Sequence, residues 1–575
     1  MTTAWFRASI PSKLRMLNAT IRWVFGPVQP PESGRVVGSR VIGSPVSARA
    51  PDGPLMDSRT ENSAAKTAEE RAPTETAAVE GGGATSLEFR APEYYADGSL
   101  HEADYRFIGS TERGWTVYRN GEEHLRLGPG YRALRTRGCG VCSTDLDRHF
   151  LPFPLPQVTG HELVADDAEG RHYVVEINAS HHARGVQDDC AFCASGLSTH
   201  CPERRVLGIH DLPGGFGSWI LAPVDAALPL PSEIPFETAL LIEPFAACLN
   251  AVTTIAPRAG ETIAVLGPRR LGLLAVAALA GHRKRSGLDF QILAISRHEP
   301  LLQLARRFGA TDTLLSSGRG DSLPDGLADV VIDTTASPVG LELAVGLARR
   351  EVHLKSTHGQ SAAGLANLTA LVVDEMVLAR LPEEADAGRG WLSTLAAGPG
   401  AGGRAARRPA KVAWLADAEP PGWLASADAR LVRDSDAAEL LAGYERSAEA
   451  GELPRADAAV VQSTEQVDRA IRPSETSELS LVRPRGEIVL PASSESCVAD
   501  SPLLRAVAGR GLRLSSSRCG DFREALDLVR RDPELLRLGE LLVTHRFGAA
   551  EIREAFAVAR SPDCIKAVIE HGTAP

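Results

Sequence analysis

A strand, a glycine turn and an apolar helix follow one another directly near the middle of this 575-residue chain. Residues 261–266 have the pattern of a buried strand, residues 267–272 begin and end with glycine, and residues 273–280 continue as an apolar helix. Such a turn lets a helix N-terminus face the phosphates of a dinucleotide. The segment therefore predicts the first βαβ unit of a doubly wound parallel sheet.

The turn departs from the pattern Gly-x-Gly-x-x-Gly at one position. Arg269 stands where a middle glycine would let the backbone approach the pyrophosphate, so its side chain either faces the phosphates or hinders them. The residues expected to contact the cofactor here are Gly267, Arg269, Arg270, Leu271 and Gly272.

The next strand, residues 291–295, ends at Ser296 and Arg297, where an acid for the ribose hydroxyls is absent. A small residue followed by arginine suits a 2′-phosphate, which favours NADP over NAD. The alternative is that Arg297 is a solvated residue before the helix at 300–308. Thr334, after a further strand, is expected near the nicotinamide ribose.

Residues that bind zinc occur in three separate segments. Cys142 is followed by His161 and Glu162, and later by Glu243. A thiolate, an imidazole and carboxylates can hold zinc and leave one position open for water or substrate, which predicts a catalytic zinc site. A redox pair of Cys139 and Cys142 is disfavoured because no thioredoxin-like unit surrounds it, and Cys139 is assigned to packing.

These motifs resemble the zinc-dependent medium-chain dehydrogenases, most of all the polyol, glucose and threonine dehydrogenase branch. The resemblance rests on Gly-x-Cys-x-x-Asp at 140–145, Gly-His-Glu at 160–162 and Glu-Pro at 243–244, and it covers about 86–378 and resumes near 508. It implies a GroES-like catalytic barrel. The roles it implies are zinc ligation by Cys142 and His161, ligation or support of a ligand by Glu162, an exchangeable ligand at Glu243, proton transfer by Thr144 and orientation of His161 by Asp145.

Three further cysteines, Cys190, Cys193 and Cys201, resemble the four-cysteine structural zinc lobe of that family. Gln187 stands where the first cysteine is expected. Either a nearby oxygen or nitrogen donor completes the site, or the lobe holds no metal and its thiols are free. The candidate donors are Asp188, Asp189, His181, His182 and His200.

The net charge of -11 and a pI near 5.8 argue against nucleic-acid binding. Nine cysteines in motif-like spacings suit a reducing compartment, so a cytoplasmic location is expected. Residues 1–31 form a basic amphipathic pattern without a membrane span, which indicates a mitochondrial-type targeting or surface helix. The slightly favoured alternative is a true start at Met56. Residues 26–85 have a disordered composition.

The predicted fold is α/β plus β, in five segments: 1–85, the basic N-terminus and linker; 86–252, the GroES-like catalytic domain; 253–380, the Rossmann dinucleotide-binding domain; 381–508, an insertion; and 509–575, the end of the Rossmann domain and of the catalytic domain. The stretch from Asp457 to Leu490 echoes 329–356. It indicates a degenerate partial duplication, although an inserted α/β unit for packing or oligomer contacts is favoured.

The sequence thus predicts a zinc-dependent oxidoreductase that interconverts an alcohol, such as a polyol or sugar, and a carbonyl with NADP or NAD. A noncatalytic relative with a degraded cofactor loop is the alternative, and a zinc-free reductase is disfavoured by the same zinc-binding residues. A small-molecule substrate and a homo-oligomer are expected, whereas nucleic-acid partners are not.

Overall fold

The computed structural model describes residues 76–572 with gaps. The gaps are residues 81–83, 149–150, 152, 187–189, 317–322, 356–359, 399–407, 426–427, 434–452, 454 and 473–478. The predicted N-terminal helix, Met56 and most of the linker predicted as disordered lie outside the described residues. No helix in the described part of the chain combines the length and the apolar character that a membrane crossing requires.

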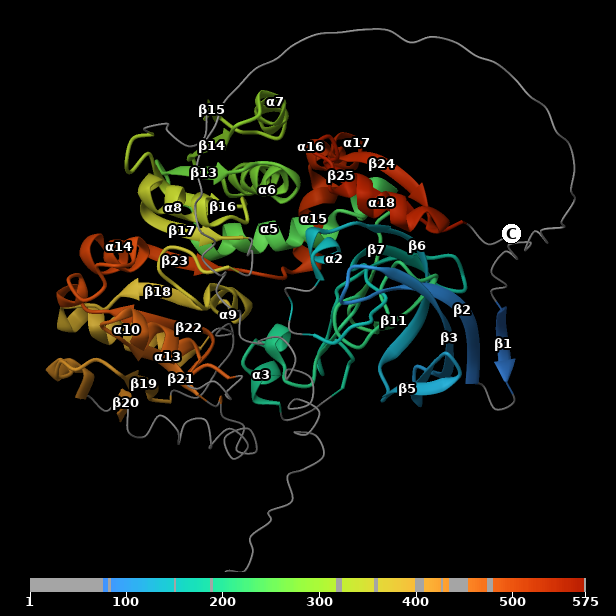
Figure 1. Cartoon of the computed structure of the whole chain (residues 1–575), viewed down its shortest axis with the longest axis horizontal. Coiled ribbons are helices and arrows are strands. Elements are labelled where there is room, and N and C mark those ends of the chain that lie inside the picture. The colour runs from blue at the N-terminus through green and yellow to red at the C-terminus, as the bar shows by residue number, and fades with distance from the viewer. Residues whose placement is uncertain are drawn as a thin grey trace, which may run out of the picture. The chain divides into compact units, whose positions relative to one another are not determined.

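One antiparallel sheet and one mostly antiparallel sheet form the first large region, shown at the right of Figure 1. The five strands of the first sheet pair in chain order: β1 (Thr76–Glu80), β2 (Ala84–Tyr94), β3 (Leu100–Ser110), β4 (Gly114–Arg119) and β5 (Glu122–Leu127). Strand β1 lies inside the segment predicted as disordered. The backbone of β1 pairs with the edge of β2, so the β structure begins earlier than the composition indicated.

The second sheet joins segments from both ends of the described chain. Its order is β12–β8–β7–β6–β25–β24, and β11 also pairs with β6. The strands are β6 (Tyr131–Gly140), β7 (Glu162–Asp166), β8 (His172–Val175), β11 (Trp219–Pro223), β12 (Ala227–Pro229), β24 (Val543–Gly548) and β25 (Lys566–Glu570). The C-terminal segment returns to this sheet, where β25 pairs with β6.

Short elements complete this region. They are α2 (Ser143–Leu146), β9 (Asn178–Ala179), α3 (Ala191–Ala194), η2 (Ser198–His200), β10 (Arg205–Val206), α4 (Phe236–Ala239), η6 (Ala549–Glu551) and α18 (Ile552–Ala559). Helix α5 (Ile242–Ile255) then leads to the second region and packs against α6, β7 and β17. Its buried side chains share one apolar core with α6 and β13, which fixes the two regions to each other.

An eleven-stranded sheet forms the second large region, and its strands are stacked from β15 to β20 in Figure 1. Its order is β15–β14–β13–β16–β17–β23–β18–β22–β21–β19–β20. We name the strands from β15 to β23 the first half-sheet and those from β18 to β20 the second half-sheet.

The first half-sheet is parallel and alternates with helices, which confirms the predicted doubly wound fold. Its elements are β13 (Thr262–Leu266), α6 (Arg270–Ser286), β14 (Gln291–Ser296), α7 (Glu299–Arg307), β15 (Asp312–Leu315), β16 (Ala328–Asp333), α8 (Pro338–Leu347), β17 (Ala348–Leu354), α9 (Leu368–Val373) and β23 (Arg513–Ser516). Helix α6 ends at the left-handed Gly287, and the Ser337 hydroxyl caps α8 by accepting from the Gly340 amide at 3.0 Å.

The second half-sheet contains the insertion. Its elements are β18 (Val377–Arg380), α10 (Ala385–Ala397), β19 (Ala410–Trp414), η3 (Gly422–Ala425), β20 (Ala429–Arg433), β21 (Ala456–Val460), α13 (Thr464–Ile471), β22 (Val482–Leu490), η5 (Ala492–Ser494) and α14 (Pro502–Arg510). Strands β19, β20, β21 and β22 all lie within the insertion. After β23, the helices α15 (Phe522–Arg531), α16 (Pro533–Leu536) and α17 (Leu538–Leu542) lead back to the β region.

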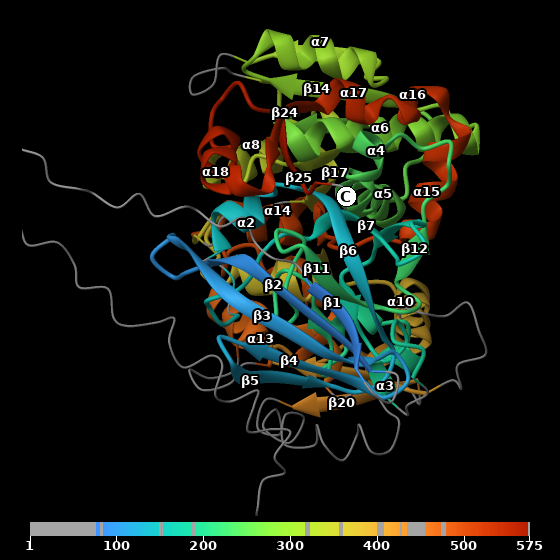
Figure 2. The ribbon, with the colours of Figure 1, turned by 90° about the vertical axis from the view of Figure 1, so that its right-hand side faces the viewer.

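The predicted boundary at residue 380 does not separate two spatial units. Strand β18 precedes that boundary but pairs with β22 of the insertion, whereas β23 follows the insertion but pairs with β17. The insertion therefore extends the same sheet. Figure 2, viewed from the right-hand side of Figure 1, shows the β strands of the first region in front of this sheet.

Candidate functional site

Cys142, His161 and Glu162 meet at one end of β6 and β7. The two strands are paired antiparallel with Gly140 opposite Glu162, which brings the segment after β6 beside the start of β7. One possible ligand atom from each of the three side chains lies within 4.8 Å of the others. His161 and Glu162 are buried and Cys142 is half-buried. A sulfur, a nitrogen and an oxygen donor therefore converge as a zinc ion requires.

Asp145 braces this cluster from the first turn of α2. Its Oδ2 accepts from the Cys142 amide at 2.9 Å and its Oδ1 accepts from the Gly160 amide at 3.0 Å. The same Oδ1 lies 3.4 Å from Nδ1 of His161. Burial lowers the pKa of His161, but Asp145 and Cys142 outweigh it and hold that pKa well above the usual value. The imidazole is thus held in an anionic environment, which also favours a cation.

Lys566 on β25 is a further charged residue of this cluster. Its Nζ donates to Oε2 of Glu162 in a short contact and to the Val141 carbonyl at 3.0 Å. Lys566 is only 5% exposed. Its ammonium offsets the cost of burying the Glu162 carboxylate. One oxygen of Glu162 is engaged in this pair.

Glu243 lies in the first turn of α5, close to the cluster but outside the group of three with converging ligand atoms. Burial raises the pKa of its carboxyl to about 7, and His161, Glu162 and Lys566 also act on it. Thr144, also predicted for this site, is half-buried on α2. The adjacent Ser143 hydroxyl accepts from Nη1 of Arg270 at 3.3 Å.

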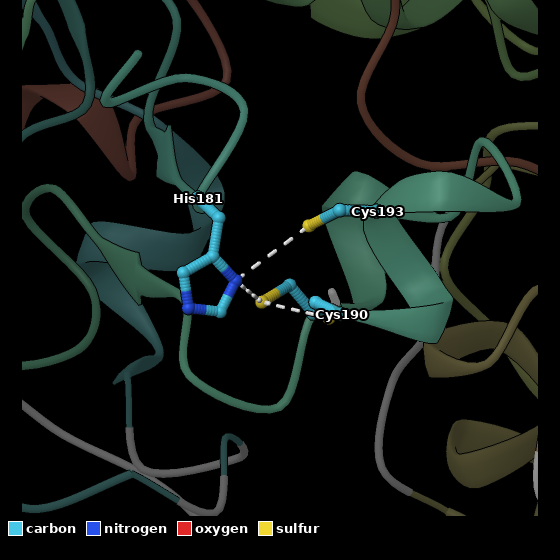
Figure 3. A group of neighbouring side chains, drawn as sticks. His181, Cys190 and Cys193 are labelled. Carbon is cyan, nitrogen blue, oxygen red and sulfur yellow. Dashed lines mark hydrogen bonds between the residues drawn. The ribbon is translucent and has the colours of Figure 1, made fainter. Parts of the chain in front are cut away.

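A second cluster combines His181 with Cys190, Cys193 and Cys201, and a possible ligand atom from each lies within 4.8 Å of the others. Nδ1 of His181 is 3.4 Å from Sγ of Cys201 and 3.9 Å from Sγ of Cys193. Figure 3 shows the imidazole facing the cysteines from a separate loop. One nitrogen and three sulfur donors match the number and type of ligands in a closed structural zinc site.

Of the fourth-ligand candidates, only His181 reaches the cysteines among the described residues. His182 is exposed, and Nε2 of His200 instead lies 3.3 Å from the Val373 carbonyl. Asp188 and Asp189 lie outside the described residues, as does Gln187. Nε2 of His181 also lies 3.2 Å from Glu203, and this contact orients the ring.

The glycine turn after β13 is tightly packed. Gly267 has a φ of +79°, and a Cβ on Gly272 would lie 2.6 Å from Oγ1 of Thr334. That hydroxyl is 2.9 Å from the carbonyls of both Leu266 and Gly267. Gly267 is therefore required by its positive φ and the approach of Thr335, and Gly272 by the approach of Thr334.

The two arginines of the turn contact the C-terminal segment. The Arg269 guanidinium donates to the carbonyls of Ser561 and, at 2.9 Å, Cys564. Nε of Arg270 donates to the Ile565 carbonyl at 2.9 Å. Both side chains thus connect the start of α6 to the segment before β25. Leu271, next in the turn, is half-buried.

Ser296 and Arg297 differ in exposure at the end of β14. Ser296 is buried and its hydroxyl accepts from the His298 amide at 3.1 Å, whereas Arg297 is exposed. The Ser296 hydroxyl therefore stabilises the turn after β14. The Arg297 guanidinium lies on the surface.

Residues 128–232 match the sequence profile described as alcohol dehydrogenase GroES-like domain. L-threonine 3-dehydrogenase from Rhizobium rhizogenes is 28% identical over 242 residues, which are 39% of this chain and 65% of that protein. Sorbitol dehydrogenase from Bacillus subtilis is 27% identical over 237 residues, which are 38% of this chain and 65% of that protein. These matches agree with the resemblance to the zinc-dependent medium-chain dehydrogenases, and they span less than two thirds of the length of the relatives named.

Among solved structures, L-idonate 5-dehydrogenase from Escherichia coli aligns with a TM-score of 0.45 at 12% identity. The alignment covers 85% of this chain and 99% of the Escherichia coli chain.

Two buried lysines close to the first cluster were missed by sequence inspection. Lys566 is one, and Lys355 after β17 is the other. Nζ of Lys355 donates to the Ser517 carbonyl at 2.7 Å and to the Arg518 carbonyl at 3.0 Å. Burial lowers its pKa, and the negative groups that oppose this shift include Glu243. For both residues, the only sequence signal of burial was a lysine within or directly after a run of apolar strand residues.

Proposed function

We propose that this chain is a zinc-dependent oxidoreductase that interconverts an alcohol and a carbonyl by hydride transfer with a nicotinamide cofactor. The observation that carries the proposal is the convergence of Cys142, His161 and Glu162 within 4.8 Å. The similarity to dehydrogenases supports it, and the relatives named above are dehydrogenases of threonine and sorbitol. A polyol, a sugar or a similar alcohol is therefore the proposed substrate class.

Cys142 and His161 are the proposed zinc ligands, with Glu162 as a third ligand or as the partner of Lys566. Glu243 is the proposed exchangeable ligand, because it lies near the cluster without belonging to it. A zinc ion held here supplies a Lewis acid that polarises the substrate oxygen and lowers the pKa of the alcohol. Asp145 keeps the His161 ring in place, and Lys566 balances the charge of Glu162.

Thr144 is the proposed proton carrier. Its position two residues after Cys142, in the first turn of α2, places a hydroxyl beside the ligand segment. The hydroxyl accepts the proton of the alcohol and donates its own proton toward solvent, so its protonation state is unchanged after each transfer.

The cofactor is proposed to bind where the turn after β13 meets α6, at Gly267, Arg269, Arg270, Leu271 and Gly272, with Thr334 near the nicotinamide ribose. The nicotinamide ring supplies the hydride acceptor in alcohol oxidation. The N-terminus of α6 attracts the pyrophosphate. The exposed Arg297 after the small Ser296 supports NADP over NAD.

His181, Cys190, Cys193 and Cys201 are proposed to hold a second, structural zinc ion. Four nitrogen and sulfur donors leave no open position, so this ion would stabilise the lobe and take no part in the reaction.

A noncatalytic relative is the second candidate. It is favoured by one observation, namely that the Arg269 side chain replaces the middle glycine and is engaged with the carbonyls of Ser561 and Cys564. Titration calorimetry with NADPH and NADH distinguishes the candidates, because the noncatalytic one requires that neither cofactor binds.

The deciding experiment measures zinc content and alcohol turnover for the natural chain and the variants Cys142→Ser and Glu243→Ala. The natural chain is screened against polyols, sugars and simple alcohols with both cofactors. The proposal requires turnover of at least one alcohol and its loss in Cys142→Ser. It fails if neither substitution changes metal content or turnover.

A further inference from the structure

The eleven-stranded sheet is symmetric about the junction between β18 and β23. Leu378 of β18 and Leu514 of β23 pair there antiparallel, whereas all other neighbouring strands of the sheet pair parallel. Outward from the junction, β23–β17–β16–β13–β14 on one side corresponds to β18–β22–β21–β19–β20 on the other. Figure 1 shows the two series above and below the junction. An arrangement of this kind is typical of a two-fold interface between copies.

The residue pairings agree with this symmetry. In the first half-sheet Val331 of β16 pairs with Val352 of β17 and with Ala264 of β13. In the second, Ala459 of β21 pairs with Ile488 of β22 and Ala413 of β19 in the same register.

An irregularity in pairing is repeated as well. It lies between Ala328 and Val330 in β16 and between Ala456 and Ala458 in β21. A shared bulge at equivalent positions is a conformational detail that two unrelated sheets would not be expected to share.

The last strands of the two half-sheets are exchanged relative to chain order. Strand β17 leads through α9 to β18, and β22 leads through α14 to β23. In space, however, β18 lies beside β22 and β23 lies beside β17. Each half-sheet is therefore completed by a strand that follows the other half-sheet in the chain, as in domain-swapped dimers.

A hydrogen-bonded chain, buried except at Arg513, joins β17 to the exchanged β23. We call it the polar ladder, and its members are Glu351, His353, Lys355, Arg513, Ser515 and Ser517. Ser517 accepts from Lys355 at 3.1 Å and donates to Nε2 of His353 at 3.0 Å. Nδ1 of His353 then donates to Ser515 at 2.8 Å.

The ladder ends at Glu351, which accepts from Ser515 and, at 2.7 Å, from Arg513. The directions follow from this network, because only a neutral imidazole with one donor and one acceptor satisfies both serines. Burial, together with Lys355 and Arg513, lowers the pKa of His353 well below its usual value, which agrees with a neutral ring.

The equivalent pair of strands in the second half-sheet has no such ladder. Val489 of β22 stands where His353 stands in β17, and Ala379 of β18 stands opposite it where Ser515 would be. If β18 lay beside β17, His353 would face Ala379 and lose its hydroxyl partner. Burying unpaired polar groups is costly, so the ladder disfavours the unexchanged arrangement.

We propose that this chain is an intramolecular pseudo-dimer, in which the second half-sheet takes the place of a second copy of the chain. The polar ladder selects β23 over β18 as the partner of β17 and so fixes the exchange of strands. The contact between β18 and β23, which would join two copies in a dimer, is thereby formed within one chain. The protein is therefore a monomer.

The second half-sheet has lost the features that would bind a cofactor. Strand β19 corresponds to β13, but it is followed by Leu-Ala-Asp-Ala-Glu-Pro at 415–420 instead of a glycine turn, and only the short η3 follows in the described residues. Asp417 and Glu419 would repel phosphates. One cofactor per chain is therefore expected, a statement that rests on the proposed function.

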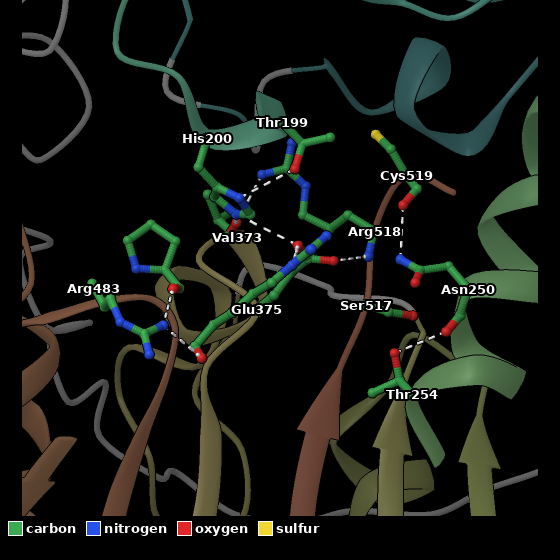
Figure 4. Close-up of polar contacts among 12 residues, drawn as sticks. Thr199, His200, Asn250, Thr254, Val373, Glu375, Arg483, Ser517, Arg518 and Cys519 are labelled. Carbon is green, nitrogen blue, oxygen red and sulfur yellow. Dashed lines mark hydrogen bonds and ion pairs between the residues drawn. The ribbon is translucent and has the colours of Figure 1, made fainter. Parts of the chain in front are cut away.

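The lobe that carries His181, Cys190, Cys193 and Cys201 contacts the second half-sheet and helps to fix its position. Phe192 of the lobe packs with Leu453, which precedes β21, and the Arg455 guanidinium lies 6.0 Å from the Phe192 ring. His200 reaches Val373 and Glu375 just before β18, and Glu375 accepts from the Arg518 amide at 2.6 Å after β23 (Figure 4). The lobe thus contacts the segment before β18 directly, and Glu375 connects that segment to the residues after β23.

Light scattering and sedimentation of the full chain over a wide concentration range test the proposal directly. A single copy of 61.1 kDa at every concentration is the expected result. A dimer or larger species overturns it, whichever surface forms the contact. This mass measurement is independent of activity, so a failed pseudo-dimer and a failed proposed function are distinguishable.

A double-substitution cycle tests the role of the ladder. Val489→His places an imidazole opposite Ala379, where it has no hydroxyl partner, and should lower Tm by several degrees. Adding Ala379→Ser should recover part of that loss, because it recreates the contact between His353 and Ser515. The matched control, Ala379→Ser alone, should have a smaller effect on Tm than Val489→His. The role of the ladder is contradicted if the double variant is no more stable than Val489→His.

Discussion

The two clusters of potential metal ligands differ in their donor atoms and in the residues that surround them. Cys142, His161 and Glu162 combine sulfur, nitrogen and oxygen, and two charged residues, Asp145 of α2 and Lys566 of β25, contact them. The lobe cluster offers four nitrogen and sulfur donors, with His181 on a separate loop from the three cysteines. A three-donor site with tunable neighbours suits catalysis, whereas a four-donor site suits structure. The number and type of ligands therefore distinguish the proposed catalytic site from the proposed structural site within one domain.

The largest effect is expected for Cys142→Ser. Loss of the thiolate removes the softest ligand of the three-donor site, so alcohol turnover should fall below detection while Tm changes little. Steady-state kinetics and thermal unfolding measure the two quantities. The control is Cys193→Ser in the lobe, which should retain turnover at temperatures where the chain stays folded. Equal loss of turnover in both variants would contradict the separation of roles.

The opposite pattern is expected for His181→Ala. Without its nitrogen donor the lobe should bind zinc more weakly, so Tm should fall and the contact between Phe192 and Leu453 should loosen. Hydrogen exchange of residues near Leu453 and Tm measure this. His182→Ala, at the exposed neighbouring histidine, is the matched control and should change neither. A normal Tm and normal zinc content in His181→Ala would show that the cysteines bind without it.

The residues that could be predicted from sequence lie in short motifs. Cys142, His161 and Glu162 were predictable because each stands in a short recognisable motif. The pairing of β6 with β7 brings those motifs together in the structure. Lys566 was missed because it lies 404 residues from Glu162, and no local pattern encodes that contact. Parallel strands were predictable from their apolar runs, but the exchange of β18 and β23 depends on His353 meeting Ser515, 162 residues later in the chain.

A moderate effect is expected for Asp145→Asn and Lys566→Met. Each substitution removes a charge that supports a proposed ligand, and such supporting contacts typically account for about 10–100-fold in metal affinity or activity. Zinc affinity measured by competition with a chelator, together with kcat/KM, provides the test. Glu203→Gln, beside His181, is the comparison in the lobe and should leave kcat/KM unchanged. If it lowers kcat/KM as much as Asp145→Asn does, the two clusters are not independent.

A change of cofactor preference is expected for Arg297→Asp. The aspartate would bind ribose hydroxyls and repel a 2′-phosphate, so the ratio of kcat/KM for NADP to that for NAD should fall by at least about tenfold. Zinc content should stay constant, because Arg297 lies in neither cluster. An unchanged ratio would mean that Arg297 does not contact the cofactor.

The smallest effect concerns Glu176, in the segment between the two clusters. Burial raises the pKa of its carboxyl to about 7, above the value of an unfolded chain. The folded state therefore retains a proton that the unfolded state loses, and this contribution to stability is lost as pH rises from about 4.5 to about 7. Glu176→Gln should reduce the change in unfolding free energy across that pH window by about 2 kcal/mol or less. Unfolding free energies at several pH values in that window measure it, and an unchanged slope would contradict the assignment.

The zinc content of the purified full chain, measured beside that of Cys142→Ser, tests the central claim most directly. About two zinc ions per chain are expected in the natural protein and about one in the variant, because the lobe keeps its own ion. The loss of that ion should coincide with the loss of alcohol turnover. An unchanged zinc content in Cys142→Ser, or full turnover without the ion, would contradict a catalytic zinc site at Cys142, His161 and Glu162.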